Sequence, residues 1–199
     1  EDASLDLSML AGQADLVLIG AGDPTAMLSL TGQCRDLRIP FAADTSWQLA
    51  RLDGEQVRTL MTGADYLFCN EYEATLTEHK TGWSTDELND KVGVRVTTLG
   101  EHGARIDRAG HSPIMVPAVP GVVPKEPTGA GDAFRAGFLA AVSWGIGLER
   151  AAQLGNMLAA HALETTGTQE YQLAPEPLAR RFAAAYGQEA AAEIAANLA

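Results

Sequence analysis

The chain of 199 residues carries 14 Lys and Arg against 26 Asp and Glu, a formal net charge of −12. This acidity argues against binding to nucleic acid or to an anionic membrane surface, since both attract clustered cations. Hydrophobic residues make up 46% of the composition, enough to form a core, and no apolar run approaches the roughly 20 residues that span a bilayer.

Apolar runs alternate with helical patterns along the first half of the chain. Near-continuous apolar or β-branched runs, typical of strands buried on both faces, predict strands over 14–20, 39–44, 66–69 and 92–99. Apolar periodicity and helix-start signals predict helices over 24–38, 47–61, 71–80 and 85–91. A small antiparallel excursion is expected over 104–107 and 113–117.

The second half of the chain is predicted to be helical. Large apolar residues recur every four positions within 130–144, and small residues within 148–163 allow a second helix to pack closely. Pro177 and Gly187 bracket a third helix, because proline favours the first turn of a helix and glycine the position after its end. The alanine-rich tail over 183–199 is expected to be helical too.

The order of these elements predicts the fold class. Strands that alternate with helices form right-handed βαβ units, so we expect an α/β fold with a mostly parallel sheet and helices on both faces. The sequence shows no internal repeat and no flexible linker, which predicts a single domain over residues 1–199. Ligands of such sheets bind beyond the carboxyl ends of the strands.

The strongest chemical signal is Gly129-Ala130-Gly131-Asp132, at the start of a predicted helix. The glycines let the backbone approach a ligand, and the free N–H groups of a helix start favour an anion. Asp132 could accept a proton from a hydroxyl nucleophile while these amides hold a phosphoryl group. The alternative is an Asp that caps the helix. A Walker A loop is excluded because no Gly-Lys-[Ser/Thr] follows.

Two further motifs follow predicted strands. Asn70 and Glu73 can face one crevice, where a carboxylate near a nucleotide commonly holds magnesium. Capping of the next helix by the same residues is the simpler alternative. The loop after Thr98, with Gly100 and Gly103, offers hydroxyl and amide donors to a phosphate chain, although a plain hairpin turn explains it as well.

Other residues carry weaker signals. The two cysteines, Cys34 and Cys69, are too few for a disulfide scaffold and fit a reducing cytosol, so we expect a cytoplasmic protein. The first two residues are acidic, unlike the basic start of a signal peptide. The four histidines lack metal-site spacing. Asp23 precedes Pro24, which predicts a helix start rather than a second anion site.

The three motifs, in this order, resemble those of the ribokinase-type (PfkB) carbohydrate and nucleoside kinases. The likeness is strongest to the bacterial adenosine kinases, extends over 42–52, 96–106, 127–141 and 163–171, and covers essentially the whole chain. It implies a ribokinase-like three-layer sandwich. It also implies transfer of the γ-phosphoryl group of ATP to the 5′-hydroxyl of adenosine, which gives AMP and ADP in purine salvage.

The resemblance assigns a role to each motif residue. Asp132 would be the general base, and the anion hole would consist of the amides of Gly129, Ala130 and Gly131. Contacts to ATP would come from Asn70, Thr98, Gly100, Gly103 and Asn156. Glu73 would organise Mg²⁺ through water, and Gln48 would contact the nucleoside.

Three departures from the family pattern bear on function. Glu126 stands where the family usually has Asp. In the family this position, with the loop at Gly167, often frames a monovalent cation; the extra methylene of Glu keeps the charge but moves it, so K⁺ is left open as a second cofactor. Trp47 replaces a polar residue near the expected nucleoside pocket. Relatives also carry an N-terminal region that supplies the first strands, a lid and most acceptor contacts, and we expect this chain to hold only the part after it.

Several alternatives stay open. A sugar kinase of the ribokinase or fructokinase type differs from an adenosine kinase mainly in that N-terminal region. A catalytically incomplete, nucleotide-binding fragment is a second alternative. A dinucleotide-binding oxidoreductase is disfavoured because no Gly-x-Gly-x-x-Gly opens the first βα unit. The expected partners are ATP and a nucleoside or sugar, without nucleic acid or membrane, and a homodimer of the full-length protein is left open.

Overall fold

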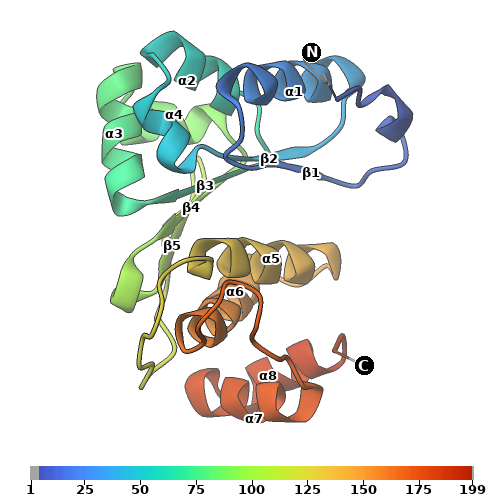
Figure 1. The fold of residues 1–199 in the computed structure, drawn as a ribbon, viewed down its shortest axis with the longest axis vertical. Helices are drawn as coiled ribbons and strands as arrows, with labels where there is room; N and C mark the ends of the chain where they lie inside the picture. Colours follow the sequence, from blue (N-terminus) through green and yellow to red (C-terminus); the bar gives the residue numbers. More distant parts are fainter. Residues whose placement is uncertain (1–4, 199) are drawn as a thin grey trace. The chain divides into compact units, whose positions relative to one another are not determined.

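Figure 1 shows a computed structural model of the chain, in which residues 5–198 are described. The chain divides into two units. Unit 1 consists of the residues up to 99 together with 105–113, and unit 2 consists of residues 100–104 together with those from 114 onward. The strands follow one another in the sheet in chain order, from β1 to β6.

Unit 1 is built from parallel strands joined by helices. Its first four strands pair in parallel with their neighbours in the sequence and are β1 (Val17–Ile19), β2 (Phe41–Asp44), β3 (Tyr66–Asn70) and β4 (Val94–Thr98). The helices that connect them are α1 (Pro24–Leu37), α2 (Gly54–Met61), α3 (Glu71–Thr81) and α4 (Thr85–Lys91). The predicted α/β class with a mostly parallel sheet is therefore confirmed.

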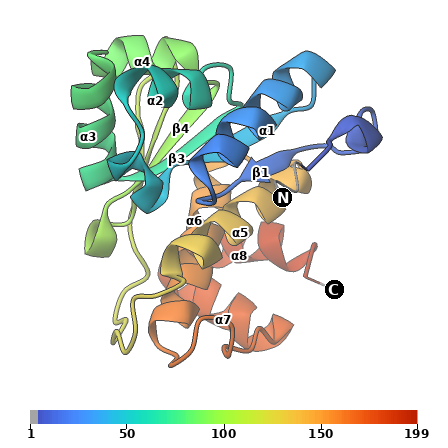
Figure 2. The same cartoon turned by 45° about the horizontal axis from the view of Figure 1, so that its top comes forward.

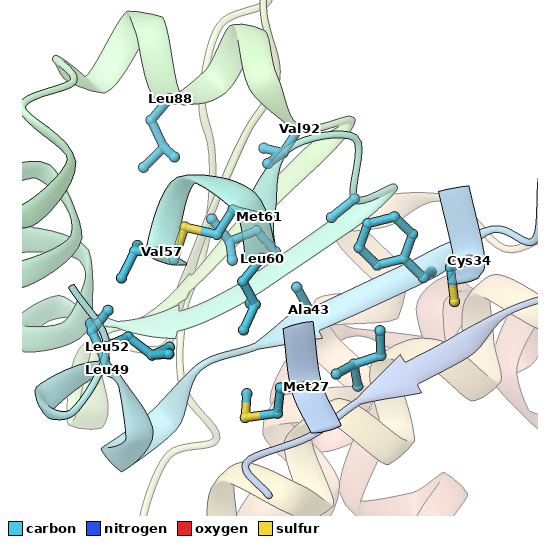
Figure 3. Close-up of a cluster of buried hydrophobic side chains, with 14 of the residues drawn as sticks. Met27, Cys34, Ala43, Leu49, Leu52, Val57, Leu60, Met61, Leu88 and Val92 are labelled. Carbon is cyan, nitrogen blue, oxygen red and sulfur yellow. The ribbon is translucent and has the colours of Figure 1, made fainter. Parts of the chain in front are cut away.

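The core of unit 1 is formed by buried side chains of strands β1 to β3 and of helices α1, α2 and α4 (Figure 3). Since side chains alternate along a strand, Phe41, Ala43 and Leu67 share the face that packs against the helices. Met27 of α1 and Leu60 of α2 are fully buried against them. Burial of such side chains contributes roughly 1.5–3 kcal/mol each, which fixes β2 and β3 and hence the residues that follow them.

One predicted helix of unit 1 is wrong. Residues 47–61 form a 3-10 segment, Ser46–Ala50, and then α2 as a separate helix. The break arises because the Asp53 side chain accepts the Gln56 N–H while the Gln56 side chain accepts the Asp53 N–H, a capping box that starts a new helix. The predicted strand over 14–20 is also longer than the observed β1.

Unit 2 is mainly helical, as predicted. Besides β6 (Ile114–Val116) it contains α5 (Ala130–Ser143), α6 (Leu148–Leu163), α7 (Pro175–Tyr186) and α8 (Gln188–Ala195), while β5 (Ala104–Asp107) contributes residues to both units. Helix α7 begins at Pro175 rather than Pro177, because the first of the two prolines already suits the first turn. The tail is helical in α8, after a break at Gly187, and Ala199 lies outside the described residues.

Helices α5 and α6 run side by side at close range (Figure 2). A Cβ at Gly137 of α5 would lie 2.8 Å from the carbonyl oxygen of Leu154, and one at Gly155 of α6 would lie 2.9 Å from that of Phe134. Both distances are too short for non-bonded atoms, so glycine at these positions lets the two backbones approach.

Replacing Gly155 with Ala should destabilise the protein by about 1–3 kcal/mol, because the added methyl group overpacks the contact between α5 and α6. The matched control is Gly32→Ala in α1, where a Cβ would meet nothing within 4 Å. That control should raise stability by about 0.5–1 kcal/mol, the usual gain for Gly to Ala in a helix. Urea unfolding measures both changes, and a Gly155→Ala variant as stable as the control would contradict the packing argument.

Candidate functional site

The start of α5 has the geometry of an anion site. Gly129 precedes the helix with a left-handed φ of 85°, and a Cβ there would lie 3.0 Å from that of Thr168, so glycine is required. The turn is closed by hydrogen bonds from Ala130 N to Pro127 O (3.3 Å) and from Ala133 N to Gly129 O (2.9 Å). The first amides of a helix have no helical carbonyl to bond, so those of this turn can donate to an anion, the Ala130 N–H only by giving up its bond to Pro127 O.

Asp132 lies in the first turn of α5 and points its carboxylate outward. Its side chain is 82% exposed, and its Oδ1 accepts a hydrogen bond from Nη2 of Arg135 at 2.6 Å. The residue before the helix is Gly129, so the alternative in which Asp132 caps the helix is wrong. An exposed carboxylate beside free helix amides can accept a proton from a bound hydroxyl group.

The structure brings Glu126 and Gly167, the two positions of the predicted cation site, into direct contact. Oε2 of Glu126 accepts a hydrogen bond from the Gly167 N–H at 2.9 Å. The amides of Lys125 and Glu126 both donate to the carbonyl of Leu163, at 2.7 and 3.2 Å. The carboxylate of Glu126 therefore ties the segment before the Gly-Ala-Gly-Asp motif to the loop after α6.

Asn156 of α6 is buried and holds a backbone carbonyl. Its Nδ2 donates to Pro117 O at 3.0 Å, and the hydroxyl of Tyr186 donates to the same oxygen at 2.9 Å. Burial raises the pKa of Tyr186 to about 12, so the phenol stays protonated and can keep donating. Sequence reasoning missed Tyr186, because no local pattern relates it to a residue 69 positions away.

Asn70 and Glu73 form a capping box at the start of α3. Oδ1 of Asn70 accepts the Glu73 N–H, and Oε2 of Glu73 accepts the Asn70 N–H, both at 2.8 Å. The simpler alternative of the sequence analysis, helix capping, is therefore realised. The box uses one oxygen of the Glu73 carboxylate, so capping by Glu73 leaves its second oxygen for another role.

Gln48 lies buried in the 3-10 segment after β2. Its Nε2 donates to the carbonyl of Gly22, while its Oε1 is buried without a hydrogen-bond partner among residues 5–198. Beside it, a cavity of about 320 Å³ is lined by Ser46, Trp47, Leu49, Ala50, Tyr72, Glu73 and Leu76. Trp47 and Tyr72 are 62% and 73% exposed. The sequence marked Gln48, Trp47 and Glu73, but the apolar character of this cavity became evident only in the fold.

The loop after β4 contains a 3-10 turn, Gly100–His102, and leads into β5, the next strand of the sheet, as the hairpin-turn alternative predicts. Thr98 ends the strand and is half-buried. Gly100 and Gly103 both have positive φ, and a Cβ at Gly103 would overlap the carbonyl oxygen of Val116 at 2.0 Å. Close backbone packing therefore accounts for Gly103, whatever the loop binds.

The remaining sequence predictions concern structural residues. The side chain of Asp23 accepts the N–H groups of Thr25 and Ala26, which confirms that it starts α1. Cys34 and Cys69 are free and buried, and burial raises the pKa of Cys69 to about 11. Within residues 5–198, no three His, Cys, Asp or Glu side chains converge on a point that could hold a metal ion. No described helix is long and apolar enough to cross a membrane.

Known proteins resemble the chain in sequence and in fold. Residues 1–175 match the sequence profile of the pfkB family carbohydrate kinases. A nucleoside kinase of Methanocaldococcus jannaschii is 26% identical over 155 residues, which cover 78% of this chain and 51% of that protein. The adenosine kinase of Schizosaccharomyces pombe is 28% identical over 161 residues, which cover 73% of this chain and 47% of that protein.

Among solved structures, the nucleoside kinase of Burkholderia thailandensis in complex with inosine superimposes with a TM-score of 0.84. It is 33% identical, and the match covers 89% of this chain and 60% of that one. This likeness confirms the predicted ribokinase-like fold. The chain spans about half the length of the curated relatives it matches.

Proposed function

The chain belongs to the pfkB family of carbohydrate kinases, and on that premise we propose that its protein transfers the γ-phosphoryl group of ATP to the 5′-hydroxyl of a nucleoside, adenosine in particular. The observation that carries this proposal is the exposed carboxylate of Asp132 in the first turn of α5, directly after the left-handed Gly129. The nucleoside kinases among its relatives support a nucleoside as acceptor.

The proposed reaction has one covalent step. The acceptor oxygen forms a bond to the γ-phosphorus, the bond from that phosphorus to the bridging oxygen of ADP breaks, and the hydroxyl proton passes to the carboxylate of Asp132. The amides of Gly129, Ala130 and Gly131 donate to the phosphoryl oxygens. Donors that are already oriented stabilise the charge of the transition state without reorganisation.

The residues of this chain fit a magnesium ion that arrives with ATP. Glu73 has one carboxylate oxygen outside its capping box, and Mg²⁺ prefers oxygen ligands and keeps several of its waters. One carboxylate does not make a metal site, and MgATP supplies the phosphate ligands, so we assign Glu73 a contact through water. Bound Mg²⁺ would neutralise charge on the phosphates. Glu126 and the Gly167 loop are the proposed site for K⁺.

The other assignments complete the proposal. Asn70, Thr98, Gly100, Gly103 and Asn156 are assigned to ATP, and Gln48 to the nucleoside, because its buried Oε1 lacks a partner among the described residues. A single-domain organisation, a cytoplasmic location and a homodimer remain predictions.

Release of ADP that depends on the acceptor tests the function. The full-length protein should release ADP from ATP fastest with adenosine, and inosine, ribose and fructose serve as competing acceptors. Preference for ribose or fructose would favour the sugar-kinase alternative, and no release with any acceptor would favour a nucleotide-binding protein without catalysis.

Replacing Glu73 with Gln should raise the Mg²⁺ concentration needed for half-maximal activity more than it raises the KM for adenosine. Gln still completes a capping box, so α3 keeps its start while the negative charge is lost. The control is Glu73→Ala, which removes both functions and should also lower the melting temperature. If Glu73→Gln leaves the Mg²⁺ dependence unchanged, capping is the only role of Glu73.

A further inference from the structure

Arg135 lies at the start of α5, beside the proposed anion hole, although no sequence motif marked it. Its Nη2 donates to Oδ1 of Asp132 at 2.6 Å, three residues back along the helix. Its Nη1 lies 3.3 Å from the position that a Cβ of Gly131 would occupy. The guanidinium therefore covers the glycine whose amide is assigned to the anion hole.

An ordinary surface ion pair does not account for this placement. Exposed pairs three residues apart on a helix contribute roughly 0.2–0.5 kcal/mol, and long side chains in such pairs usually extend into solvent. The side chain of Arg135 is only 17% exposed, while that of Asp132 is 82% exposed. Any side chain at Gly131 would press on the guanidinium, so this glycine also makes room for a cation at the helix start.

The start of α5 thus combines three attractions for an anion: free amides, the positive end of the helix dipole and a guanidinium. In this structure Nη2 of Arg135 donates to the carboxylate of Asp132. A phosphoryl group carries more negative charge than a carboxylate and accepts two parallel hydrogen bonds from the planar guanidinium. It should therefore compete well for Arg135.

We propose that Arg135 binds the γ-phosphoryl group of ATP. When the nucleotide binds, Arg135 gives up its hydrogen bond to Asp132 and donates to the phosphoryl oxygens instead. This inference rests on the proposed function and adds a residue to it. In the absence of ATP, Arg135 occupies an oxygen of the base. Once Arg135 bonds to the phosphoryl oxygens, Oδ1 of Asp132 is released to accept the hydroxyl proton. The base is then available only when there is a phosphoryl group to transfer.

The test compares two nucleotides that differ in the γ-phosphoryl group. Calorimetry on the full-length protein would measure the affinity of ADP and of a non-hydrolysable ATP analogue. Arg135→Met should lower the affinity for the ATP analogue by at least about tenfold, or about 1.4 kcal/mol, and leave the affinity for ADP nearly unchanged. Arg135→Lys, which keeps the charge without the planar donors, should lie between. The matched control is Arg180→Met, because Arg180 is an exposed residue that pairs with Glu176 one turn away.

Equal affinity changes for both nucleotides, or none, would overturn the proposal and leave Arg135 as a stabiliser of the helix start. Circular dichroism checks the fold. If Arg135→Met unfolds, Arg135→Lys decides between the outcomes by the ratio of its affinities for the ATP analogue and for ADP. The proposed function can fail separately: a wild-type protein that phosphorylates no nucleoside would refute it, while the ratio of the two affinities would still decide the role of Arg135.

Discussion

Replacing Asp132 with Asn is expected to lower the turnover of the full-length protein in the proposed reaction by roughly 10²–10⁴-fold, the usual contribution of a general base. Asn has nearly the same shape as Asp and its side-chain oxygen can still accept the hydrogen bond from Arg135, so the fold and ATP binding should persist. Steady-state kinetics and a thermal melt would measure the two effects.

Asp86→Asn is the matched control for this substitution. Asp86 is also exposed and also lies in the first turn of a helix, α4, but it is not one of the residues assigned to the proposed site. It should leave turnover unchanged. Near-normal turnover in a correctly folded Asp132→Asn variant would remove Asp132 from its assigned role and, with it, the main argument for the mechanism.

The 199-residue chain by itself is expected to bind ATP weakly and to phosphorylate adenosine at no useful rate. It spans about half the length of its curated relatives, and the resemblance places most acceptor contacts outside it. Orientation of bound reactants can lower a barrier by roughly 7–11 kcal/mol. Without that orientation, Asp132 and the anion hole have no positioned hydroxyl group to act on.

The same chain should self-associate or be only marginally stable. Strand β1 lies at one end of the strand order, and the large apolar side chains of Leu5, Met9 and Leu18 are exposed. Uncovered strand edges and apolar patches promote association. The isolated chain would be assayed beside the full-length enzyme and sized by light scattering. A monodisperse monomer that melts cooperatively and has full activity would contradict both expectations.

Local signals in the sequence predicted most of the fold. The bounds of α4 and α6 were predicted as observed. A capping box of Ser84 and Glu87 marks the start of α4, whereas α6 begins after Gly147 without a side-chain cap. The break before α2 was missed, since the apolar spacing continues across it. Its signal was nevertheless present in Asp53 followed three residues later by Gln56.

Less of the candidate site could be predicted from the sequence, because the residues that pack against its motif residues are distant in the chain. The motif around Asp132 is local, and its signal is clear. By contrast, Thr168 packs against Gly129, and Tyr186 and Asn156 donate to the same carbonyl, that of Pro117, only after α5 to α8 have packed. Arg135 is close in sequence, but only the low exposure of its side chain, 17%, distinguishes it from an ordinary helix arginine.

The capping box of α3 affects how inactive relatives of this protein should be recognised, if the proposed function holds. Asn70 and Glu73 start a helix as well as bearing on the proposed chemistry, so selection for folding alone would retain them. Asp132 caps nothing and lies open to solvent, so drift could erase it once catalysis ceased to matter. A homologue that keeps the Asn-x-x-Glu pair but lacks the aspartate is thus expected to be a folded pseudoenzyme, and the aspartate alone should separate the two classes.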